Sequence, residues 1–435
     1  FMGVTMNVRE QGRGGLAQGV LIGFTIGAVL VGLAFLATER TIGWQSEPSA
    51  EGTRRAVESA AATVPSAEPV LNRHLETLSR RALSPSDQGI LVETLDGEVL
   101  MEHNSSRAIN PASVLKLAPT LIALERYGPD HRFRTAFLVN GLIADGVLEG
   151  TLGVRSDGDP TFGREDVKAI ADGLRRAGVR QVNGDLLVAG PFSFHTTDET
   201  PAAVRAGVRV SGAARPVTAV DGTEVHAVES APLLEIVRRL NGHSDNRLGD
   251  NLGTTVGGPA AIERYVVESL GVSGDEVLVG RPSGLGHNEL SARAAMRILR
   301  ALHEVCGRNG ISLDSIIPLN GVDSGTMRAR LVSDEMTGAI AAKTGTHYSQ
   351  DGGVASLTGV AYTDEKGPVL FVVLNSRGPV VEYRRWQDDL LEDVVATFGG
   401  ARPPARALAA ARPRSVPNAP EAVGATDPFE ARVGD

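Results

Sequence analysis

The sequence predicts an α+β fold in which helices flank an antiparallel sheet, with an inserted β-rich subdomain and an N-terminal transmembrane helix. Three observations support this prediction. Strand-like segments lie near both ends of the folded region, with amphipathic helices between them. Residues 133–220 change to short strands broken by glycine and aspartate, which indicates an insertion. The chain is 42% apolar and 22% charged, as is typical of globular proteins.

The N-terminal segment contains a run of 25 uncharged residues, 14–38. This run is long enough to span a bilayer and longer than the apolar region of an ordinary cleaved signal peptide. Arg9 and Arg13 precede it, so the positive-inside rule places the N-terminus in the cytoplasm and the rest of the chain outside. Residues 1–44 are therefore predicted to be a cytoplasmic stub and a single-pass membrane anchor. Cleavage near Gly32 is the alternative, and it would make the protein periplasmic or secreted.

Glycines recur every four residues within this run, at Gly15, Gly19, Gly23 and Gly27. On a helix they would share one face, and small residues on one face allow two membrane helices to approach closely. The spacing therefore permits a homodimer, although glycine is also common in membrane helices that do not pair.

Two further segments have little to bury. Residues 45–69 carry no large apolar residues at a regular period and are predicted to be a linker. Residues 401–435 are dominated by alanine, proline and arginine and are predicted to be a disordered tail. The folded part is then a main domain formed by residues 70–132 and 221–400, interrupted by the inserted subdomain at 133–220.

The main domain is predicted to begin with a helix, a hairpin and a second helix. Residues 70–83 have apolar residues on one helical face. Residues 89–95 and 98–102 alternate in the manner of strands, and Asp96-Gly97 between them forms a tight turn. Residues 113–127 are apolar nearly all round, which predicts a buried central helix.

The remaining elements follow from the same periodicities. The inserted subdomain carries one amphipathic helix, at residues 165–177. Further helices of the main domain are predicted at residues 231–240, 259–270, 290–305 and 381–397. Its closing strands are predicted at residues 339–343, 354–363 and 368–375.

Three short motifs occur in order along the chain. They are Ser113-Val114-Leu115-Lys116, Ser244-Asp245-Asn246 and Lys343-Thr344-Gly345. Together they resemble the S-x-x-K, S-D-N and K-T-G set of serine penicillin-recognising enzymes. On a helix, residues three apart share a face, so the Lys116 amine can reach the Ser113 hydroxyl. A lysine acts as a base only if burial or a nearby cation destabilises its ammonium, and Lys343 is the expected neighbour.

Each motif alone has an ordinary structural explanation. A serine can merely cap a helix, Ser-Asp-Asn is a common turn sequence, and Lys-Thr-Gly can end a strand. However, only four of the 43 basic residues are lysines, and two of those four occupy the two lysine positions of the motifs. Arginine could not replace them as a base, because it stays protonated. We therefore interpret the three motifs as functional.

Longer segments extend the resemblance. They are Asn110-Pro111-Ala112-Ser113-Val114-Leu115-Lys116-Leu117, Gly158-Asp159-Pro160-Thr161, Asn183-Gly184-Asp185-Leu186, Glu229-Ser230-Ala231-Pro232-Leu233 and Gly321-Val322-Asp323-Ser324-Gly325-Thr326-Met327-Arg328. These segments resemble the D-alanyl-D-alanine carboxypeptidase/endopeptidase family, the type-4 class-C penicillin-binding proteins. The resemblance covers most of residues 70–380. It implies a β-lactamase/transpeptidase-like catalytic domain with an insertion between the first two motifs.

The resemblance also implies three catalytic residues and a substrate. Ser113 is expected to attack the carbonyl between two D-alanines of a peptidoglycan stem peptide, and neutral Lys116 to accept its proton. Ser244 is expected to relay a proton to the leaving nitrogen. β-Lactams are expected to acylate the same serine and act as inhibitors.

Five substrate-binding residues follow from the same resemblance: Asn246, Lys343, Thr344, Gly345 and Thr346. The first is expected to hold the substrate amide and the Lys116 amine. The next two are expected to meet the terminal carboxylate with positive charge and a hydroxyl. The glycine is expected to leave room for substrate along the strand edge. The backbone N–H groups of Ser113 and Thr346 are expected to form the oxyanion hole.

The chain departs from the family pattern in two places. Ser113 and Ser244 are 131 residues apart, which is short for the family and indicates an insertion reduced to one subdomain. The segment Arg281-Pro282-Ser283-Gly284-Leu285-Gly286 stands where the family usually has Asp-Gly-Ser-Gly-Leu-Ser. The second departure leaves the three motifs intact but changes the expected wall near the active site.

Two other functions remain open. One is a β-lactamase or esterase on the same scaffold, because the motifs do not set the rate of deacylation. The other is a wall-binding protein whose active site has decayed. His243, next to Ser244, is a weaker candidate for the base than Lys116, because no carboxylate is marked to orient it.

Composition argues against several partners. A net charge of −9 argues against nucleic acid. The single cysteine, Cys306, rules out cysteine-rich metal sites and is expected to be a small buried apolar residue. The sequence contains no His-Glu-x-x-His motif and no glycine-rich phosphate loop, and we expect no cofactor.

Overall fold

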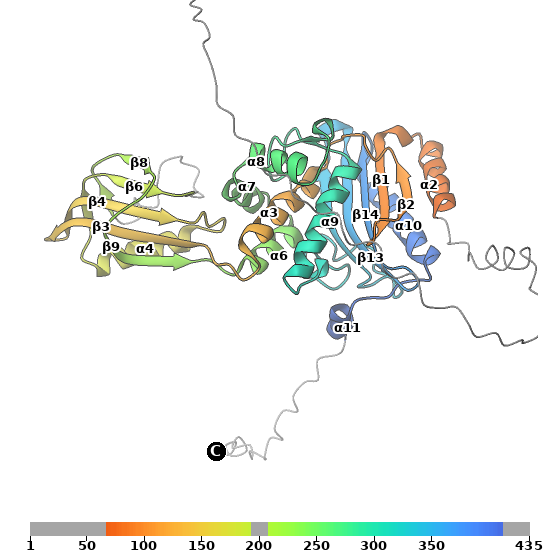
Figure 1. Cartoon of the computed structure of the whole chain (residues 1–435). Coiled ribbons are helices and arrows are strands. Elements are labelled where there is room, and N and C mark those ends of the chain that lie inside the picture. The colour runs from red at the N-terminus through yellow and green to blue at the C-terminus, as the bar shows by residue number, and fades with distance from the viewer. Residues whose placement is uncertain (1–66, 193–207, 412–435) are drawn as a thin grey trace, which may run out of the picture. The chain divides into compact units, whose positions relative to one another are not determined.

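A five-stranded antiparallel sheet forms the centre of the main domain in the computed structural model, which describes residues 67–192 and 208–411 (Figure 1). Its strands lie in the order β12 (Ile340–His347), β13 (Val354–Thr363), β14 (Gly367–Ser376), β1 (Gln88–Thr94) and β2 (Val99–His103). Every neighbouring pair is antiparallel. The sheet thus joins the two ends of the domain, and the predicted α+β class is confirmed.

Helices cover both faces of this sheet. One face packs against α9 (Ala292–Arg308), whose core also contains α3 (Leu117–Tyr127) and α6 (Leu233–His243), and the other face packs against α2 (Glu68–Arg80) and α10 (Val380–Thr397). Successive residues of a strand point to opposite faces, so Phe371 lies in the second of these cores while its neighbours Leu370 and Val372 lie in the first. Both strands are therefore buried along almost their whole length, and β14 is continuously apolar from Val369 to Leu374.

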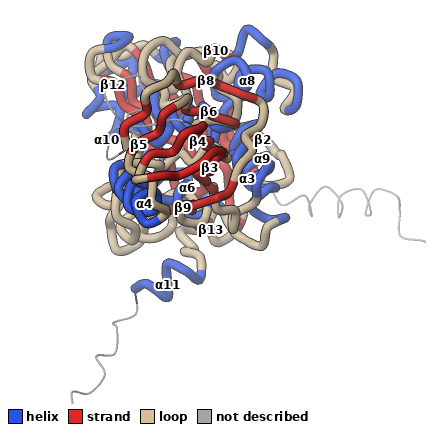
Figure 2. The backbone as a smooth tube through the Cα atoms, turned by 90° about the vertical axis from the view of Figure 1, so that its left-hand side faces the viewer, coloured by secondary structure: helices blue, strands red, loops and turns tan. Residues whose placement is uncertain are grey.

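The inserted segment forms a separate sheet. β3 (Arg134–Ala144) pairs antiparallel with β4 (Val147–Ser156) and with β9 (Thr223–Glu229). Four short strands complete it through parallel pairs: β5 (Gln181–Asn183), β6 (Leu186–Ala189), β7 (Arg209–Val210) and β8 (Ala214–Val217). Helix α4 (Arg164–Arg176) packs beside β9 (Figure 2). The predicted end of this segment at residue 220 is wrong, because β9 belongs to the same sheet as β3.

Two predicted helices are interrupted. The chain forms a 3₁₀ helix over Ala112–Lys116 and only then α3, where one helix over 113–127 was predicted. Pro119 explains the break, since it has no N–H to donate to the Leu115 carbonyl of a continuous α-helix. The predicted helix over 259–270 is α8 (Pro259–Arg264) followed by a π-helical turn, Tyr265–Ser269. The π turn has no explanation in the local sequence.

One helix and one small sheet of the main domain were not predicted. Helix α7 (Asn246–Thr255) contains two glycines and two threonines, which are weak helix formers, so tertiary packing rather than propensity stabilises it. Strands β10 (Val277–Leu278) and β11 (Glu289–Leu290) form a two-stranded sheet.

The prediction of a disordered tail from residue 401 is wrong for residues 401–411. Ala401 forms a β-bridge with Thr363, and α11 spans Ala405–Ala411. Ala407 is buried in the core that contains α9. Residues 412–435 lie outside the described residues, as do the predicted anchor at 14–38 and most of the linker. Within residues 67–192 and 208–411, every helix is too short or too polar to cross a bilayer.

Arg406 of α11 ties the tail to the main domain. Its Nε donates to Asp314 Oδ2 at 3.0 Å and its Nη1 donates to Asp323 Oδ1 at 2.9 Å. Asp314 is buried, so Arg406→Ala would leave a buried carboxylate without its cationic partner, with the hydroxyls of Ser312 and Tyr362 as its side-chain donors. We expect the free energy of unfolding in urea to fall by roughly 1–3 kcal/mol, since Arg406 is itself partly exposed.

Arg402→Ala is the matched control. Arg402 lies in the same tail but is 73% exposed, and its Nη1 is 3.5 Å from Asp364. We expect its loss to cost about 0.5 kcal/mol or less. Equal effects of the two substitutions would contradict a specific anchoring role for Arg406.

Candidate active site

The backbone is strained immediately before Ser113. Ala112 is fully buried and has a φ of 48°, in the left-handed region that residues with a Cβ rarely adopt. Its N–H donates to Asn110 Oδ1 at 2.9 Å, and Asn110 Nδ2 donates to Asp351 Oδ2 at 2.8 Å. Strain that the surroundings maintain in this way is concentrated at functional sites, which supports Ser113 as a candidate nucleophile.

Lys116 lies in the same 3₁₀ helix, and its amine reaches Ser113 as the spacing predicted. Lys116 Nζ is 2.8 Å from Ser113 Oγ and 2.8 Å from Asn246 Oδ1, and it also donates to the Ser283 carbonyl. An amide oxygen and a carbonyl oxygen can only accept hydrogen bonds. A neutral Lys116 would therefore keep its two N–H groups on Asn246 and Ser283 and direct its lone pair at the Ser113 hydroxyl.

The second motif lies at the junction of α6 and α7. Ser244 ends α6 in the left-handed conformation, with φ 56°, and Asp245 caps α7 by accepting from the Leu248 N–H at 3.0 Å. Asn246 is the first residue of α7. This turn brings the Ser244 hydroxyl and the Asn246 amide to the site from the ends of two helices.

Lys343 reaches the second motif from β12. Its Nζ donates to Ser244 Oγ at 2.8 Å and to the Thr344 carbonyl at 2.7 Å. The three motifs are thus linked: Lys116 connects the first to the second, and Lys343 connects the second to the third.

Burial lowers the pKa of both lysines. It lowers the pKa of Lys116 to about 8, against the opposing attraction of Asp250 and Asp245. Burial, and then the charge of Lys116, hold the pKa of Lys343 well below its ordinary value. The repulsion between the two lysines thus lowers the pKa of Lys343, whereas the pKa of Lys116, on which Lys343 was predicted to act, is lowered by desolvation.

A cavity of about 390 Å³ opens at these residues. Five predicted site residues line it: Ser113, Ser244, Asn246, Thr344 and Thr346. Three others were not predicted as site residues: Thr326, Arg330 and Arg384. Thr326 belongs to a segment that carries the family resemblance, and Arg330 lies just beyond it, so that segment was an available signal. Arg384 lies on α10, far along the chain from every motif, and has no such signal.

Gly345 is needed for a close approach. A Cβ at this position would lie 2.6 Å from the Pro111 carbonyl oxygen and 3.1 Å from Ala112 Cβ. The glycine therefore lets β12 pack against the turn that carries Ser113. Its predicted role, leaving room for substrate, stays a prediction.

The departing segment 281–286 forms the wall behind Lys116. Its Ser283 carbonyl accepts from Lys116, and its Ser283 N–H donates to Asp250 Oδ1 at 2.9 Å. Arg281 Nε donates to the other oxygen of Asp250 at 2.8 Å. None of these three residues lines the cavity, and the departing residue Arg281 supports the base indirectly, through the Asp250 carboxylate that holds the Ser283 N–H.

Gly284 provides a test of this support. It has a φ of +80°, and a Cβ there would lie 2.0 Å from the Ala112 carbonyl oxygen. We expect Gly284→Ala to displace the Ser113 turn and to lower the rate constant of acylation by a fluorescent penicillin roughly 10- to 100-fold.

The matched control is Gly286→Ala in the same loop. Gly286 has a φ of +74°, but a Cβ there would meet no atom within 4 Å. Both substitutions place an alanine at a positive φ and so introduce a similar backbone strain, but only Gly284→Ala brings a Cβ against the turn that carries Ser113. Equal acylation rates in the two variants would exclude an effect through Ala112.

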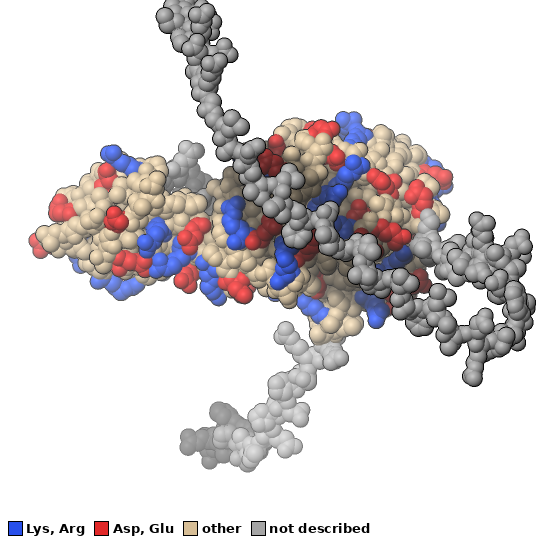
Figure 3. Space-filling view, viewed as in Figure 1, with Lys and Arg blue, Asp and Glu red and all other residues tan. Residues whose placement is uncertain are grey.

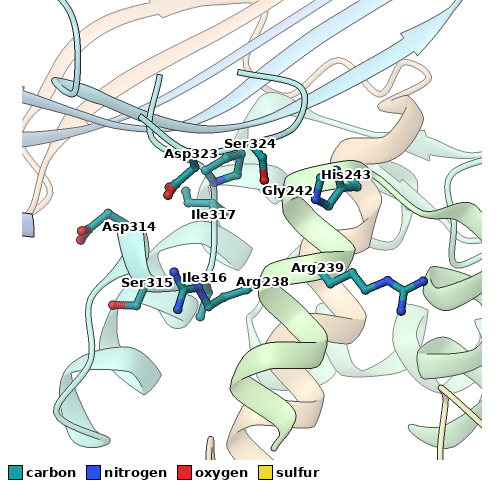
Figure 4. Close-up of a pocket in the computed structure, with 11 residues that line it drawn as sticks. Arg238, Arg239, Gly242, His243, Asp314, Ser315, Ile316, Ile317, Asp323 and Ser324 are labelled. Carbon is teal, nitrogen blue, oxygen red and sulfur yellow. The ribbon is translucent and has the colours of Figure 1, made fainter. Parts of the chain in front are cut away.

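A second hollow, of about 170 Å³, lies between α6 and residues 314–324 (Figure 4). His243 lines this hollow and not the catalytic cavity, which supports the choice of Lys116 as the base.

Cys306 is buried in the core, and burial raises the pKa of its thiol to about 12, as suits an apolar packing residue. On the face shown in Figure 3, basic and acidic side chains are interspersed.

Sequence comparisons cover most of the chain. The profile of the D-Ala-D-Ala carboxypeptidase 3 (S13) family matches residues 71–199 and 201–391. A D-alanyl-D-alanine carboxypeptidase, DacB, of Haemophilus influenzae is 29% identical over 126 residues, 28% of this chain and 26% of that protein. A D-alanyl-D-alanine carboxypeptidase of an Actinomadura species is 36% identical over 103 residues, 22% of this chain and 18% of that protein. The matched segments thus span about a quarter or less of these relatives.

Structural comparisons show the fold. A predatory peptidoglycan endopeptidase of Bdellovibrio bacteriovorus matches with a TM-score of 0.60 at 19% identity, covering 73% of this chain and 94% of that one. Penicillin-binding protein 4 of Haemophilus influenzae matches with a TM-score of 0.58 at 18% identity, covering 71% and 95%. The chain therefore has the α+β penicillin-binding/β-lactamase-like fold.

Proposed function

The chain belongs to the D-Ala-D-Ala carboxypeptidase 3 (S13) family, and on that premise we propose that it is a serine D-Ala-D-Ala carboxypeptidase/endopeptidase of peptidoglycan stem peptides. The observation that carries the proposal is the contact of 2.8 Å between Lys116 Nζ and Ser113 Oγ. The other two partners of the Lys116 amine, Asn246 Oδ1 and the Ser283 carbonyl, can only accept hydrogen bonds. The Ser113 hydroxyl is therefore the one partner of this amine that can give it a proton.

Acylation follows from this arrangement. Neutral Lys116 takes the Ser113 proton as Oγ forms a bond to the carbonyl carbon between the two D-alanines. The backbone N–H groups of Ser113 and Thr346 stabilise the oxyanion. The C–N bond then breaks, and water later hydrolyses the acyl-enzyme.

Ser244 relays the proton that the leaving nitrogen needs: it gives its hydroxyl proton to that nitrogen and takes a proton from the Lys343 ammonium in its place. Its Oγ accepts a hydrogen bond from Lys343, so its own proton is available to the cavity that it lines. Asn246 holds the Lys116 amine through its Oδ1 and leaves its Nδ2 for the substrate carbonyl. Because Lys343 is buried, its ammonium contacts the Ser244 hydroxyl rather than the substrate.

β-Lactams are proposed to acylate Ser113 and to be released slowly. A structural relative, a predatory endopeptidase of Bdellovibrio bacteriovorus, is known in a penicillin G-acylated form with a TM-score of 0.58 at 21% identity.

We also propose that residues 14–38 anchor the chain in the membrane and leave the catalytic domain on its outer side, because this uncharged run is long enough to cross a bilayer. Cell fractionation of the full chain and of a variant without these residues tests the attachment to the membrane. The oligomeric state of the full chain tests whether the glycine-lined helices pair as a homodimer.

The test of function uses two substrates and one label. We expect the purified protein to release D-alanine from a diacyl-Lys-D-Ala-D-Ala peptide and to retain a fluorescent penicillin on Ser113, located by peptide mapping. Rapid turnover of a chromogenic cephalosporin without D-alanine release would favour the β-lactamase or esterase alternative. Binding to cell-wall sacculi with neither release nor labelling would overturn the proposal in favour of a decayed wall-binding protein.

The pH dependence of acylation tests the base. Only neutral Lys116 can accept the Ser113 proton, and the neutral form dominates above its pKa of about 8. We therefore expect the acylation rate constant to rise about tenfold per pH unit below that pKa and to level off above it. Stopped-flow labelling with a fluorescent penicillin measures this profile, and circular dichroism checks the fold at each pH. A rate that is flat or falls over this range would exclude Lys116 as the base.

A further inference from the structure

We infer that Arg384, rather than Lys343, receives the free carboxylate at the leaving-group end of the substrate. This inference rests on the proposed function, because it names the group that recognises one end of that substrate. It reassigns the positive charge that the family resemblance gave to Lys343.

Lys343 is in the wrong place to meet a carboxylate. Its side chain is fully buried and does not line the catalytic cavity. Two of its three N–H donors are occupied by Ser244 Oγ and the Thr344 carbonyl. A substrate in the cavity would contact these two residues before it reached the ammonium group.

Two arginines line the cavity in its place, and they differ in their partners. Arg330 Nε donates to Asp388 at 2.9 Å, and its Nη2 donates to the same carboxylate, so its charge is already compensated. The Arg330 Nη2 also donates to the Arg384 carbonyl at 3.1 Å. Arg330 is therefore a positioning residue that holds this turn of α10 against the cavity.

Arg384 has no such carboxylate. Its Nη2 donates to Thr346 Oγ1 at 2.7 Å, and its Cζ lies 5.9 Å from the centre of the Tyr348 ring. Among the described residues, no carboxylate forms an ion pair with it. The partly buried guanidinium thus brings to the cavity wall a positive charge that no described carboxylate contacts directly, and the nearby Asp388 attracts it only through space while binding Arg330.

Thr346 completes the recognition of a carboxylate. Because its Oγ1 accepts from Arg384, its own hydrogen is free to donate into the cavity. A carboxylate placed there would receive the Thr346 O–H and further N–H groups of the planar guanidinium, a forked arrangement that an ammonium cannot reproduce. This end of the cavity is therefore specific for a substrate that ends in a free carboxylate, as a carboxypeptidase substrate does.

The test compares a diacyl-Lys-D-Ala-D-Ala peptide with the same peptide ending in an amide. We expect wild-type protein to prefer the acid, and Arg384→Gln to lower kcat/KM for the acid roughly 10- to 100-fold while changing that for the amide little. Arg384→Lys should recover only part of the preference, because the charge remains and the fork is lost. Arg385→Gln is the matched control, since Arg385 is 68% exposed on the same helix and pairs with Glu382.

The outcomes separate this inference from the proposed function. An equal loss on acid and amide, or an undiminished preference for the acid in Arg384→Gln, would overturn the role of Arg384 even if Ser113 is acylated. Calorimetric binding of both peptides to Ser113→Ala gives a readout that needs no turnover. Suppose that wild-type protein is not acylated, but Ser113→Ala binds the acid peptide and loses that binding when Arg384→Gln is added. The proposed function then fails and the inference stands. If Ser113→Ala binds acid and amide alike, the inference fails.

Discussion

Ser113→Ala is expected to abolish covalent labelling by a fluorescent penicillin and to lower the rate of D-alanine release by about a thousandfold or more. The reason is chemical: Ser113 Oγ lies 2.8 Å from the Lys116 amine, and the two other partners of that amine are acceptors that leave its lone pair directed at this hydroxyl. The substitution removes one hydroxyl and one hydrogen bond, so the thermal unfolding midpoint should change little. Gel fluorescence and D-alanine assay measure the two losses.

Ser349→Ala is the control for this prediction. Ser349 is exposed in the loop after β12 and does not line the cavity, so its loss should leave labelling and turnover unchanged. Retained labelling of Ser113→Ala, mapped by mass spectrometry to Ser244 or another residue, would refute the assignment of the nucleophile.

Lys116→Arg is expected to lower the rate constant of acylation by about a thousandfold or more, even though it keeps a positive charge at the same position. An arginine cannot lose its proton at accessible pH, so it offers the Ser113 hydroxyl no lone pair. The bulkier guanidinium must also fit between Ser283 and Gly249, whose missing Cβ would already lie 3.1 Å from Lys116 Cε. In this variant the acylation rate constant should also no longer rise with pH.

Lys168→Arg is the matched control, because Lys168 is exposed on α4 and the exchange is chemically the same. We expect wild-type rates from this variant. If Lys116→Arg stayed within tenfold of wild type, another group would have to be the base, and the contact with Ser113 would be structural.

Local sequence patterns predicted those parts of the fold that depend on neighbours in the chain. The apolar stretches of β13 and β14 and the helical periodicity of α9 indicate which segments are buried, because each segment carries this pattern in its own residues. The contact between Ser113 and Lys116 was predictable for the same reason, since residues three apart on one helical turn are neighbours.

Errors arose where distant residues decide the structure. Helix α7 has little intrinsic preference to form and depends on packing against α3 and α6. Helix α11 is ordered because Arg406 meets two aspartates about ninety residues earlier in the chain. The insertion ends later than predicted because β9 pairs with β3 across the whole segment.

The amino-acid sequence by itself determined which groups we propose to react: one serine, two lysines placed where an amine is needed, and the hydroxyl and amide residues of the three motifs. Only the tertiary structure decided what each group faces. It buries Lys343 behind Ser244, places the Ser283 carbonyl on Lys116, and brings Arg384 from the last long helix to Thr346. The physical reason is that charge state and hydrogen bonding depend on solvent exposure and on contacts between segments, which a linear pattern does not contain.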